Sequence, residues 1–171
     1  MNQQEVTKSQ PVSKRMVWEA CKAVKRNGGS AGVDRQSIAM FDEAQPKNLY
    51  KIWNRMSSGS YFPPPVRTVL IPKANGSKRA LGIPTVSDRI AQMVVKNHLE
   101  PMIDQEFSSQ SYGYRPGKSA HDAVSSARAN CHKYGWIIDL DIKGFFDNLN
   151  HDKMMLLLKL TYTGTMDNTV C

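Results

Sequence analysis

The chain has 171 residues, 40% hydrophobic and 22% charged, which suits a globular protein of one domain, or one domain plus part of another. No run approaches the roughly 18 to 20 apolar residues of a membrane span, and the polar N-terminus does not resemble a signal peptide. The net charge of +8 fits either a nucleic-acid-binding face or a solvated basic surface. The three cysteines, Cys21, Cys131 and Cys171, are too far apart for a disulfide framework or a zinc knuckle, so we expect a reducing, cytoplasmic location.

The first part of the chain predicts helices separated by a glycine-rich loop. Residues 1–12 are expected to form a flexible tail, and a helix follows Ser13 and ends at Asn27-Gly28-Gly29. The apolar face of this helix is Val17, Cys21 and Val24. A second helix is predicted around residues 49–56. The loop over residues 28–34 has no strand before it, so we do not interpret it as a phosphate-binding glycine loop.

A β-hairpin is predicted next, with strands over residues 66–72 and 78–83. The Asn75-Gly76 dipeptide between them tolerates positive φ at both positions of a tight turn. Across such a ribbon, Lys73 and Arg79 could converge on one anion, and an ammonium with a guanidinium fork suits a triphosphate. Basic side chains also simply keep an exposed ribbon soluble, and the residues alone leave both interpretations open.

Two further helices begin with the spacing of a capping box. Thr85 and Asp88 open one that should run to about Leu99, because Pro101 limits its continuation. Another opens at Ser119, with Asp122 three residues later. An apolar stripe at helical spacing follows in it: Ala120, Ala123, Val124, Ala127 and Cys131.

Residues 136–147 carry the candidate chemistry. Read with the two-residue period of a strand, Trp136, Ile138, Leu140 and Ile142 point one way. Asp139 and Asp141 point the other way, and carboxylates on an apolar strand are costly to bury without compensation. They are either solvated on an exposed face or bind a hard cation such as Mg²⁺. Phe145 and Phe146 follow, either as core residues or as a wall for a nucleotide sugar.

Six segments occur in a fixed order. They are Gly32-Val33-Asp34, Tyr61-Phe62-Pro63-Pro64-Pro65-Val66-Arg67, Ile71-Pro72-Lys73, Arg79 to Val86 with Asp88-Arg89, Ser111 to Ser119, and Asp141 to Asp147 with His151. Taken together, they resemble the reverse transcriptases encoded by group II introns, over about residues 28–151.

The resemblance implies a mixed α/β (α+β) fold from a right-hand polymerase. Residues 13–134 would form the fingers, largely helical with a β-hairpin, and residues 135–171 the start of the palm with its first strand. It also implies nucleotidyl transfer by two Mg²⁺ ions in the full-length protein. The implied partners are the RNA template, intron RNA, a DNA primer and deoxynucleoside triphosphates, with no membrane.

The resemblance also implies roles for individual residues. Asp141 would be the catalytic first palm carboxylate and hold Mg²⁺ with help from the Ile142 carbonyl. The residues implied to bind the incoming nucleotide are Lys73, Arg79 and Phe146. The first two would grip its triphosphate, and the ring would pack against its sugar and disfavour a 2′-hydroxyl. Arg89 and Arg115 lie in motifs that face the template strand.

The pattern of the family is incomplete in this chain. The second palm element, typically Tyr-Ala-Asp-Asp, does not occur in the 171 residues, nor do the Gln-Gly segment, the thumb or the RNA-splicing domain. One carboxylate cannot hold two divalent ions, so we expect an N-terminal fragment without polymerase activity of its own. A palm strand without neighbours would leave an exposed edge and apolar surface, which predicts homodimerisation or marginal stability.

Two other functions remain open from the residues. The first is an RNA-binding module that holds structured intron RNA without catalysis, which suits the basic charge. The second is a small metal-dependent hydrolase that uses Asp139, Asp141, His151 and Asp152. That hydrolase would require His151 to approach the strand carboxylates, whereas we expect it in the first turn of the last helix.

Overall fold

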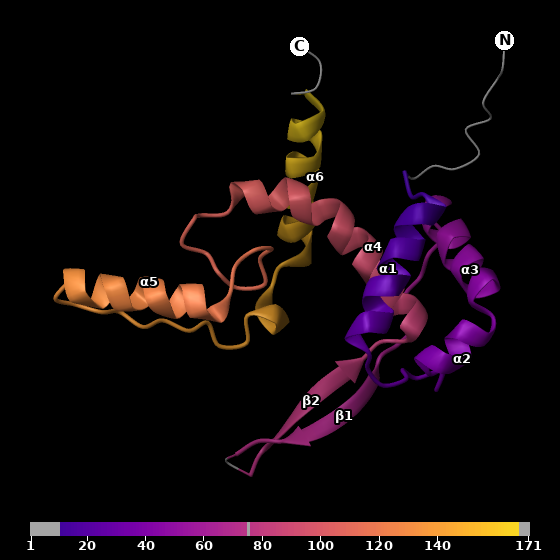
Figure 1. Ribbon diagram of the computed structural model, residues 1–171, viewed down its shortest axis with the longest axis horizontal. Helices are drawn as coiled ribbons and strands as arrows, with labels where there is room; N and C mark the ends of the chain where they lie inside the picture. The colour runs from indigo at the N-terminus through magenta and orange to yellow at the C-terminus, as the bar shows by residue number, and fades with distance from the viewer. Residues whose placement is uncertain (1–10, 75, 168–171) are drawn as a thin grey trace. The chain divides into compact units, whose positions relative to one another are not determined.

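The computed structural model describes residues 11–74 and 76–167, with the backbone alone over 161–167 (Figure 1). The predicted tail therefore lies outside the described residues, apart from its last two. The chain divides into two compact units, Met1–His98 and Leu99–Cys171, each of which is described by itself. The predicted boundary between fingers and palm at residues 134/135 concerns subdomains and stays a prediction.

The described residues of the first unit form three helices and the start of a fourth: α1 (Lys14–Asn27), α2 (Ile38–Glu43), α3 (Gln45–Ser57) and α4 (Val86–Ile103). The predicted first helix is confirmed: the Ser13 hydroxyl accepts a hydrogen bond from the Met16 N–H, and Gly28 ends it at a φ of 67°. The helix predicted around residues 49–56 is confirmed as α3. The short α2, capped by Ser37, was not predicted, because six residues carry almost no periodic signal.

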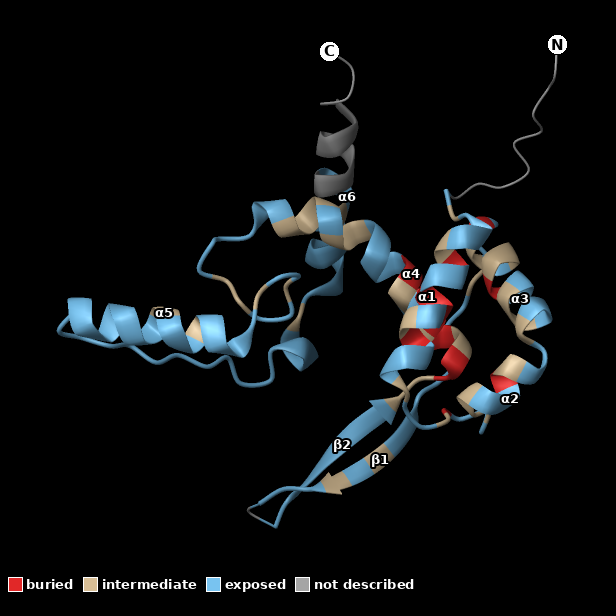
Figure 2. Ribbon diagram, in the orientation of Figure 1, coloured by how far each residue is buried: buried red, intermediate tan, exposed pale blue. Residues whose placement is uncertain are grey.

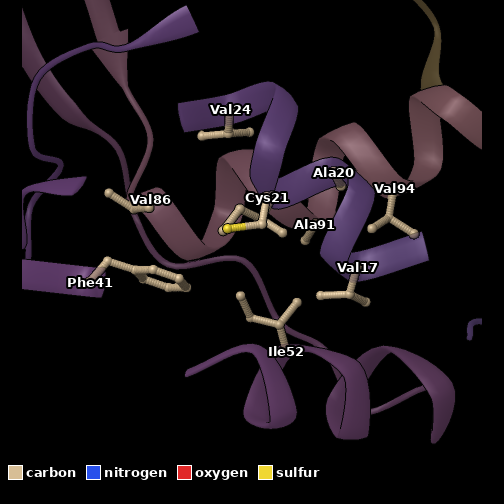
Figure 3. Close-up of a cluster of buried hydrophobic side chains, with 10 residues drawn as sticks. Val17, Ala20, Cys21, Val24, Phe41, Ile52, Val86, Ala91 and Val94 are labelled. Atoms are coloured by element: carbon tan, nitrogen blue, oxygen red, sulfur yellow. The ribbon is translucent and has the colours of Figure 1, made fainter. Parts of the chain in front are cut away.

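The core of the first unit lies where these four helices meet (Figures 2 and 3). Its buried apolar residues are Val17, Ala20, Cys21 and Val24 of α1, Phe41 of α2, Ile52 of α3, and Val86, Ile90, Ala91 and Val94 of α4. The α1 residues recur at the i, i+3, i+4, i+7 spacing of one helix face. Since burying a Val, Ile or Phe side chain contributes about 1.5–3 kcal/mol, this cluster is the main stabilising element of the unit.

The predicted β-hairpin is confirmed. Strands β1 (Arg67–Pro72) and β2 (Lys78–Ile83) pair antiparallel, with Arg67 opposite Ile83 and Pro72 opposite Lys78. Gly76 has a φ of 78° in the turn, and Asn75 lies outside the described residues. No residue of the two strands is buried, so the ribbon presents its side chains to solvent (Figure 2).

Helix α4 differs from its prediction at both ends. The Thr85 hydroxyl accepts from the Asp88 N–H at 3.1 Å, as predicted, but the Asp88 carboxylate bonds to Tyr61 and Gln92. The helix also continues past Leu99 and through Pro101 to Ile103. Pro101 lies only two residues before the end of the helix. There it removes one backbone hydrogen bond, a loss that the last turn of a helix tolerates.

The second unit holds the end of α4, the 3₁₀ turns η1 (Asp104–Glu106) and η2 (Phe146–Asn148), and the helices α5 (Ala120–Lys133) and α6 (His151–Asp167). The predicted capping box of α5 is confirmed: the Ser119 hydroxyl accepts from the Asp122 N–H, and the Asp122 carboxylate accepts from the Ser119 N–H. None of the described side chains in this unit is buried, so the apolar stripe of α5 has no covering layer (Figure 2).

The predicted palm strand is not formed. Residues 136–142 form neither helix nor strand, and the two-stranded β1–β2 hairpin is the only sheet among the described residues. A strand is stabilised by ladder hydrogen bonds to a neighbour, which no described segment supplies here. The mixed α/β class, helices with a small antiparallel sheet, is nevertheless confirmed. No helix among the described residues is both long and apolar enough for a membrane crossing.

Candidate functional site

The hairpin brings two predicted nucleotide-binding residues to one face. Ile71 and Arg79 are directly opposite in the ladder, so their side chains share a face. The Lys73 N–H donates to the Ser77 carbonyl at 2.7 Å, which carries the pairing one step beyond the strands. Lys73 follows Ile71 by two residues and therefore returns to the face of Arg79. Both side chains are exposed.

The predicted metal ligand Asp141 and its neighbour Ile142 lie just before a sharp reversal of the chain. Gly144 adopts a φ of 63°, and its carbonyl accepts from both the backbone N–H of Asn148, at 3.1 Å, and the Asn148 Nδ2, at 2.8 Å. A side chain at Gly144 would be strained at this φ. Asp141 precedes this turn and lies five residues before η2, and its side chain is exposed.

Phe146 opens η2 and presents its ring to solvent. The ring is 83% exposed and meets Phe145 edge-on at a centroid distance of 5.3 Å. Phe146 is therefore not a core residue among the described residues, although a core role was one of the two interpretations of this aromatic pair. The exposed face of the ring is free for a flat contact with a sugar.

The donor set at Asp141 is suited in kind to a hard cation. Its carboxylate and the Ile142 carbonyl are both oxygen ligands, and Mg²⁺ completes its octahedron with waters or phosphates. Among the described residues, no three His, Cys, Asp or Glu side chains gather closely enough to hold a metal ion. That finding includes the set proposed for a hydrolase, and His151 begins α6, in the position predicted for it.

Arg89 of α4 forms hydrogen bonds to the glycine loop. Its Nη1 donates to the Gly28 carbonyl at 2.9 Å and its Nη2 to the Ser30 carbonyl at 3.0 Å. A Cβ added at Gly29 would lie 2.4 Å from that Nη1, and one added at Gly32 would lie 2.7 Å from the Thr85 backbone. The glycines of this loop therefore permit its close approach to α4, which sequence patterns alone did not explain. Contact between Arg89 and a template strand stays a prediction.

Arg115 organises the loop between η1 and α5. Its Nε donates to the Asp104 Oδ1 at 2.7 Å, and Nη2 donates to the Asp104 carbonyl and Oδ2. Nη1 donates to the carbonyls of Ser108 and Ser111, so all five N–H donors have acceptors within the loop. The hydrogen bond from Arg115 lowers the pKa of the Asp104 carboxyl. Contact between Arg115 and nucleic acid stays a prediction.

Sequence reasoning missed a buried carboxylate in the first unit. Asp88 accepts from the Tyr61 hydroxyl at 3.1 Å and from the Gln92 amide at 2.8 Å, and it is 4% exposed. Burial, and then the nearby Asp88 charge, raise the pKa of Tyr61 well above its usual range. The four-residue spacing of Asp88 and Gln92 was a visible signal, but the contact with Tyr61 spans 27 residues and was not.

Comparisons with known proteins show which sequences this chain is similar to. The model of a family described as reverse transcriptase (RNA-dependent DNA polymerase) matches residues 71–166. Group II intron-encoded protein LtrA of Lactococcus lactis subsp. cremoris is 36% identical over 120 residues, which cover 70% of this chain and 20% of that protein. Protein YkfC of Escherichia coli K12 is 35% identical over 129 residues, 72% of this chain and 34% of that protein. An uncharacterized 91 kDa protein in the cob intron of Schizosaccharomyces pombe is 38% identical over 126 residues, 74% of this chain and 15% of its own length.

Proposed function

Because the chain belongs to the reverse transcriptase (RNA-dependent DNA polymerase) family, of the group II intron kind, we propose that it supplies the nucleotide-binding fingers and the first catalytic aspartate of such a polymerase. The chain spans about a third of YkfC and a fifth of LtrA, the relatives that it matches. Its partners would be the RNA template, intron RNA, a DNA primer and deoxynucleoside triphosphates. The observation that carries the proposal is the shared, exposed face of Lys73 and Arg79 on the β1–β2 hairpin.

The two cations would bind the triphosphate of the incoming nucleotide. The Arg79 guanidinium offers paired donors to phosphate oxygens, and the Lys73 ammonium neutralises charge beside it. Phe146 would pack against the sugar of the nucleotide.

The test is binding of a fluorescent deoxynucleoside triphosphate in the presence of Mg²⁺. Arg79→Ala and Lys73→Ala should each weaken binding about ten- to hundredfold, since a charge-assisted hydrogen bond contributes about 1.5–3 kcal/mol. Lys78→Ala is the matched control, because Lys78 adjoins Arg79 but points to the opposite face of the ribbon, across from Pro72. Equal losses for all three variants would show general charge attraction and contradict a defined triphosphate site.

Catalysis would require more than this chain contains. The family uses divalent metal ions, and Asp141 with the Ile142 carbonyl would hold one Mg²⁺ in the complete polymerase. The metal would stabilise charge on the transferring phosphoryl group. The chain's own residues would orient the triphosphate and the sugar against it. Since the second aspartate pair of the family pattern is not in these 171 residues, we infer that the chain alone has no polymerase activity.

The exposed apolar residues of 136–142 would pair with a second copy of the chain. Trp136, Ile138 and Leu140 are all more than 80% exposed. Burying such a surface is favourable, and extended residues can add a strand to a neighbour. Light scattering during gel filtration should therefore show a dimer at high concentration, and a strict monomer would contradict this pairing.

We propose a cytoplasmic location, in keeping with the free thiols of Cys21 and Cys131.

A second candidate function is RNA binding without catalysis. It is favoured by the net charge of +8 and by the exposed cations of the hairpin. The affinity for intron RNA should fall steeply as salt rises, because each phosphate contact releases condensed counterions. An affinity that is flat between low and high salt would contradict this candidate.

A further inference from the structure

A groove between α1 and α3 lies apart from the residues discussed so far. Its volume is about 340 Å³, within the range of small-ligand sites, and it is lined by Lys14, Trp18, Pro46, Leu49, Tyr50 and Trp53. Two of its large rings are open to solvent: Trp18 is 45% exposed and Tyr50 55%. All of its lining belongs to the first unit, where α1 packs against α3 (Figure 1).

One ring of the groove, that of Trp53, is held by a hydrogen bond. The Trp53 indole N–H donates to the Val12 carbonyl at 3.0 Å, which fixes the ring against the core. Tyr50 lies 5.5 Å from Trp53, centroid to centroid, at an interplanar angle of 52°. Tyr50 and Trp18 are about half exposed, so they are the rings that can receive a flat partner from solvent. A groove with two such rings binds planar groups with little loss of side-chain entropy.

The rim of the groove is cationic. The Lys14 ammonium lies 4.7 Å from the Trp53 centroid and 6.0 Å from the Tyr50 centroid. On α1, Arg15 and Lys22 lie three residues before and four residues after Trp18, so they are its neighbours on the helix surface. Lys47 has the same relation to Tyr50 on α3. Glu19 pairs with Lys22 at 2.7 Å and offsets one of these four charges.

We propose that this groove binds single-stranded RNA. An unpaired base lies against Tyr50 and Trp18, and Lys14 contacts the phosphate beside it. Aromatic platforms within a basic groove are the usual means of holding single strands, because every base has a face to stack. The site rests on the second candidate function, RNA binding, and does not depend on Lys73, Arg79 or Asp141.

Two alternative ligands follow from the same groove and differ from single-stranded RNA. A duplex keeps its bases stacked on one another and offers only phosphates, so the rings add nothing to its binding. A proline-rich peptide also docks in aromatic grooves, but it carries no charge that the cationic rim would attract. The rim therefore favours RNA.

The test variants remove the rings and keep apolar bulk. Trp18→Leu and Tyr50→Leu remove the stacking faces, whereas Trp18→Phe and Tyr50→Phe retain a ring. Tyr134→Leu is the matched control, because Lys133 lies over the Tyr134 ring at 5.3 Å but this pair does not line the groove. Thermal unfolding of each variant confirms that the first unit remains folded.

The measurement is fluorescence anisotropy of a labelled, unstructured RNA of about 12 nucleotides, a length within the usual site sizes. Each Leu variant should weaken binding about five- to hundredfold, which corresponds to the stacking of one base, and each Phe variant should restore most of it. Tyr134→Leu should leave the affinity unchanged, and a blunt RNA duplex should bind all variants alike. Lys14→Gln should lower the slope of log affinity against log salt by about 0.7, the value for one phosphate on a single strand.

The outcomes separate this site from the general RNA-binding candidate. RNA binding that survives both Leu variants unchanged overturns the groove and leaves the candidate function standing. Equal losses on single-stranded and duplex RNA also overturn the groove, since they indicate lost charge or folding. Competition between a proline-rich peptide and RNA, with the peptide bound more tightly, assigns the groove to peptide. No RNA binding by the parent chain overturns both.

Discussion

The two units of the chain differ in how their side chains are covered. In the described part of Met1–His98, four helices bury ten apolar residues, and Arg89 of α4 bonds to two carbonyls of the glycine loop. In the described part of Leu99–Cys171, no side chain is buried, although this unit carries Asp141 and Phe146. The residues implied to perform chemistry therefore lie where local turns hold the backbone and no core holds the side chains. Catalytic geometry needs support from surrounding packing, so the described part of this unit would hold the proposed active-site residues without the rigidity that catalysis needs.

Hydrogen exchange should show the largest contrast between the units. Amides of α1 and α3 should exchange only through global unfolding, about a thousandfold or more below their intrinsic rates. At a concentration low enough to keep the chain monomeric, amides of 136–142 should exchange near their intrinsic rates, because this segment belongs to no helix or sheet among the described residues. Mass spectrometry of peptic fragments measures both. Strong protection over 136–142 in the monomer would show that the segment is paired within the chain and would contradict the contrast between the units.

A matched pair of substitutions tests the same contrast through stability. Ile90→Ala removes a fully buried side chain and should lower the free energy of unfolding by about 2–5 kcal/mol. Ile138→Ala removes an identical side chain that is 82% exposed and should change it by less than about 0.5 kcal/mol. Urea unfolding followed by circular dichroism provides both values. A large effect of Ile138→Ala would indicate that the second unit has a covered surface.

Features that depend on neighbouring residues were predicted from the sequence, whereas contacts between distant segments were not. The α1 stripe, the hairpin and the Ser119 cap depend on neighbouring residues, so their spacing was sufficient. The Tyr61–Asp88 contact and the position of Arg89 on the glycine loop join distant segments, and no local pattern encodes them. The palm strand was predicted wrongly, because an alternating pattern indicates a strand only where a partner strand exists.

Thiol labelling compares one cysteine from each unit, in a Cys171→Ser background. Cys131 is exposed and should react quickly with a maleimide, whereas Cys21 is buried. Desolvation by burial raises the pKa of Cys21, against smaller opposite effects of Gln45 and Lys25, so both access and thiolate fraction are reduced. We expect Cys21 to react about a hundredfold or more slowly. Similar rates, measured by intact-mass spectrometry, would contradict a stable core around α1.

The pH dependence of stability should differ between the units: low pH should destabilise the second unit and high pH the first. In the second unit, Arg115 lowers the pKa of Asp104, and the Ser119 hydrogen bonds lower that of Asp122. The stabilisation from these two carboxylates is complete above the usual carboxyl pKa of 3.8. It is lost as the pH falls through the lower pKa values of the folded protein. In the first unit, the raised pKa of Tyr61 makes stability fall as the pH rises above its usual value of 10.0.

Helicity and near-ultraviolet signals followed against pH check both limbs. Tyr61→Phe should remove the alkaline loss in the first unit, because no phenol then ionises beside Asp88. An alkaline loss of the same size in this variant would show that another group causes it. Asp104→Asn should shift the acid limb of the second unit, and an unchanged acid limb would show that the Arg115 contact is not formed in solution.

Primer extension tests the central proposal most directly, namely that Asp141 would be one catalytic aspartate and that these 171 residues do not supply its partners. The chain is incubated with an RNA template, an annealed DNA primer, deoxynucleoside triphosphates and Mg²⁺, beside a reverse transcriptase of known activity. The account predicts no extension above background, for the parent chain and for Asp141→Asn alike. Robust synthesis that disappears in Asp141→Asn would contradict it, because the 171 residues would then hold both metal ions by themselves.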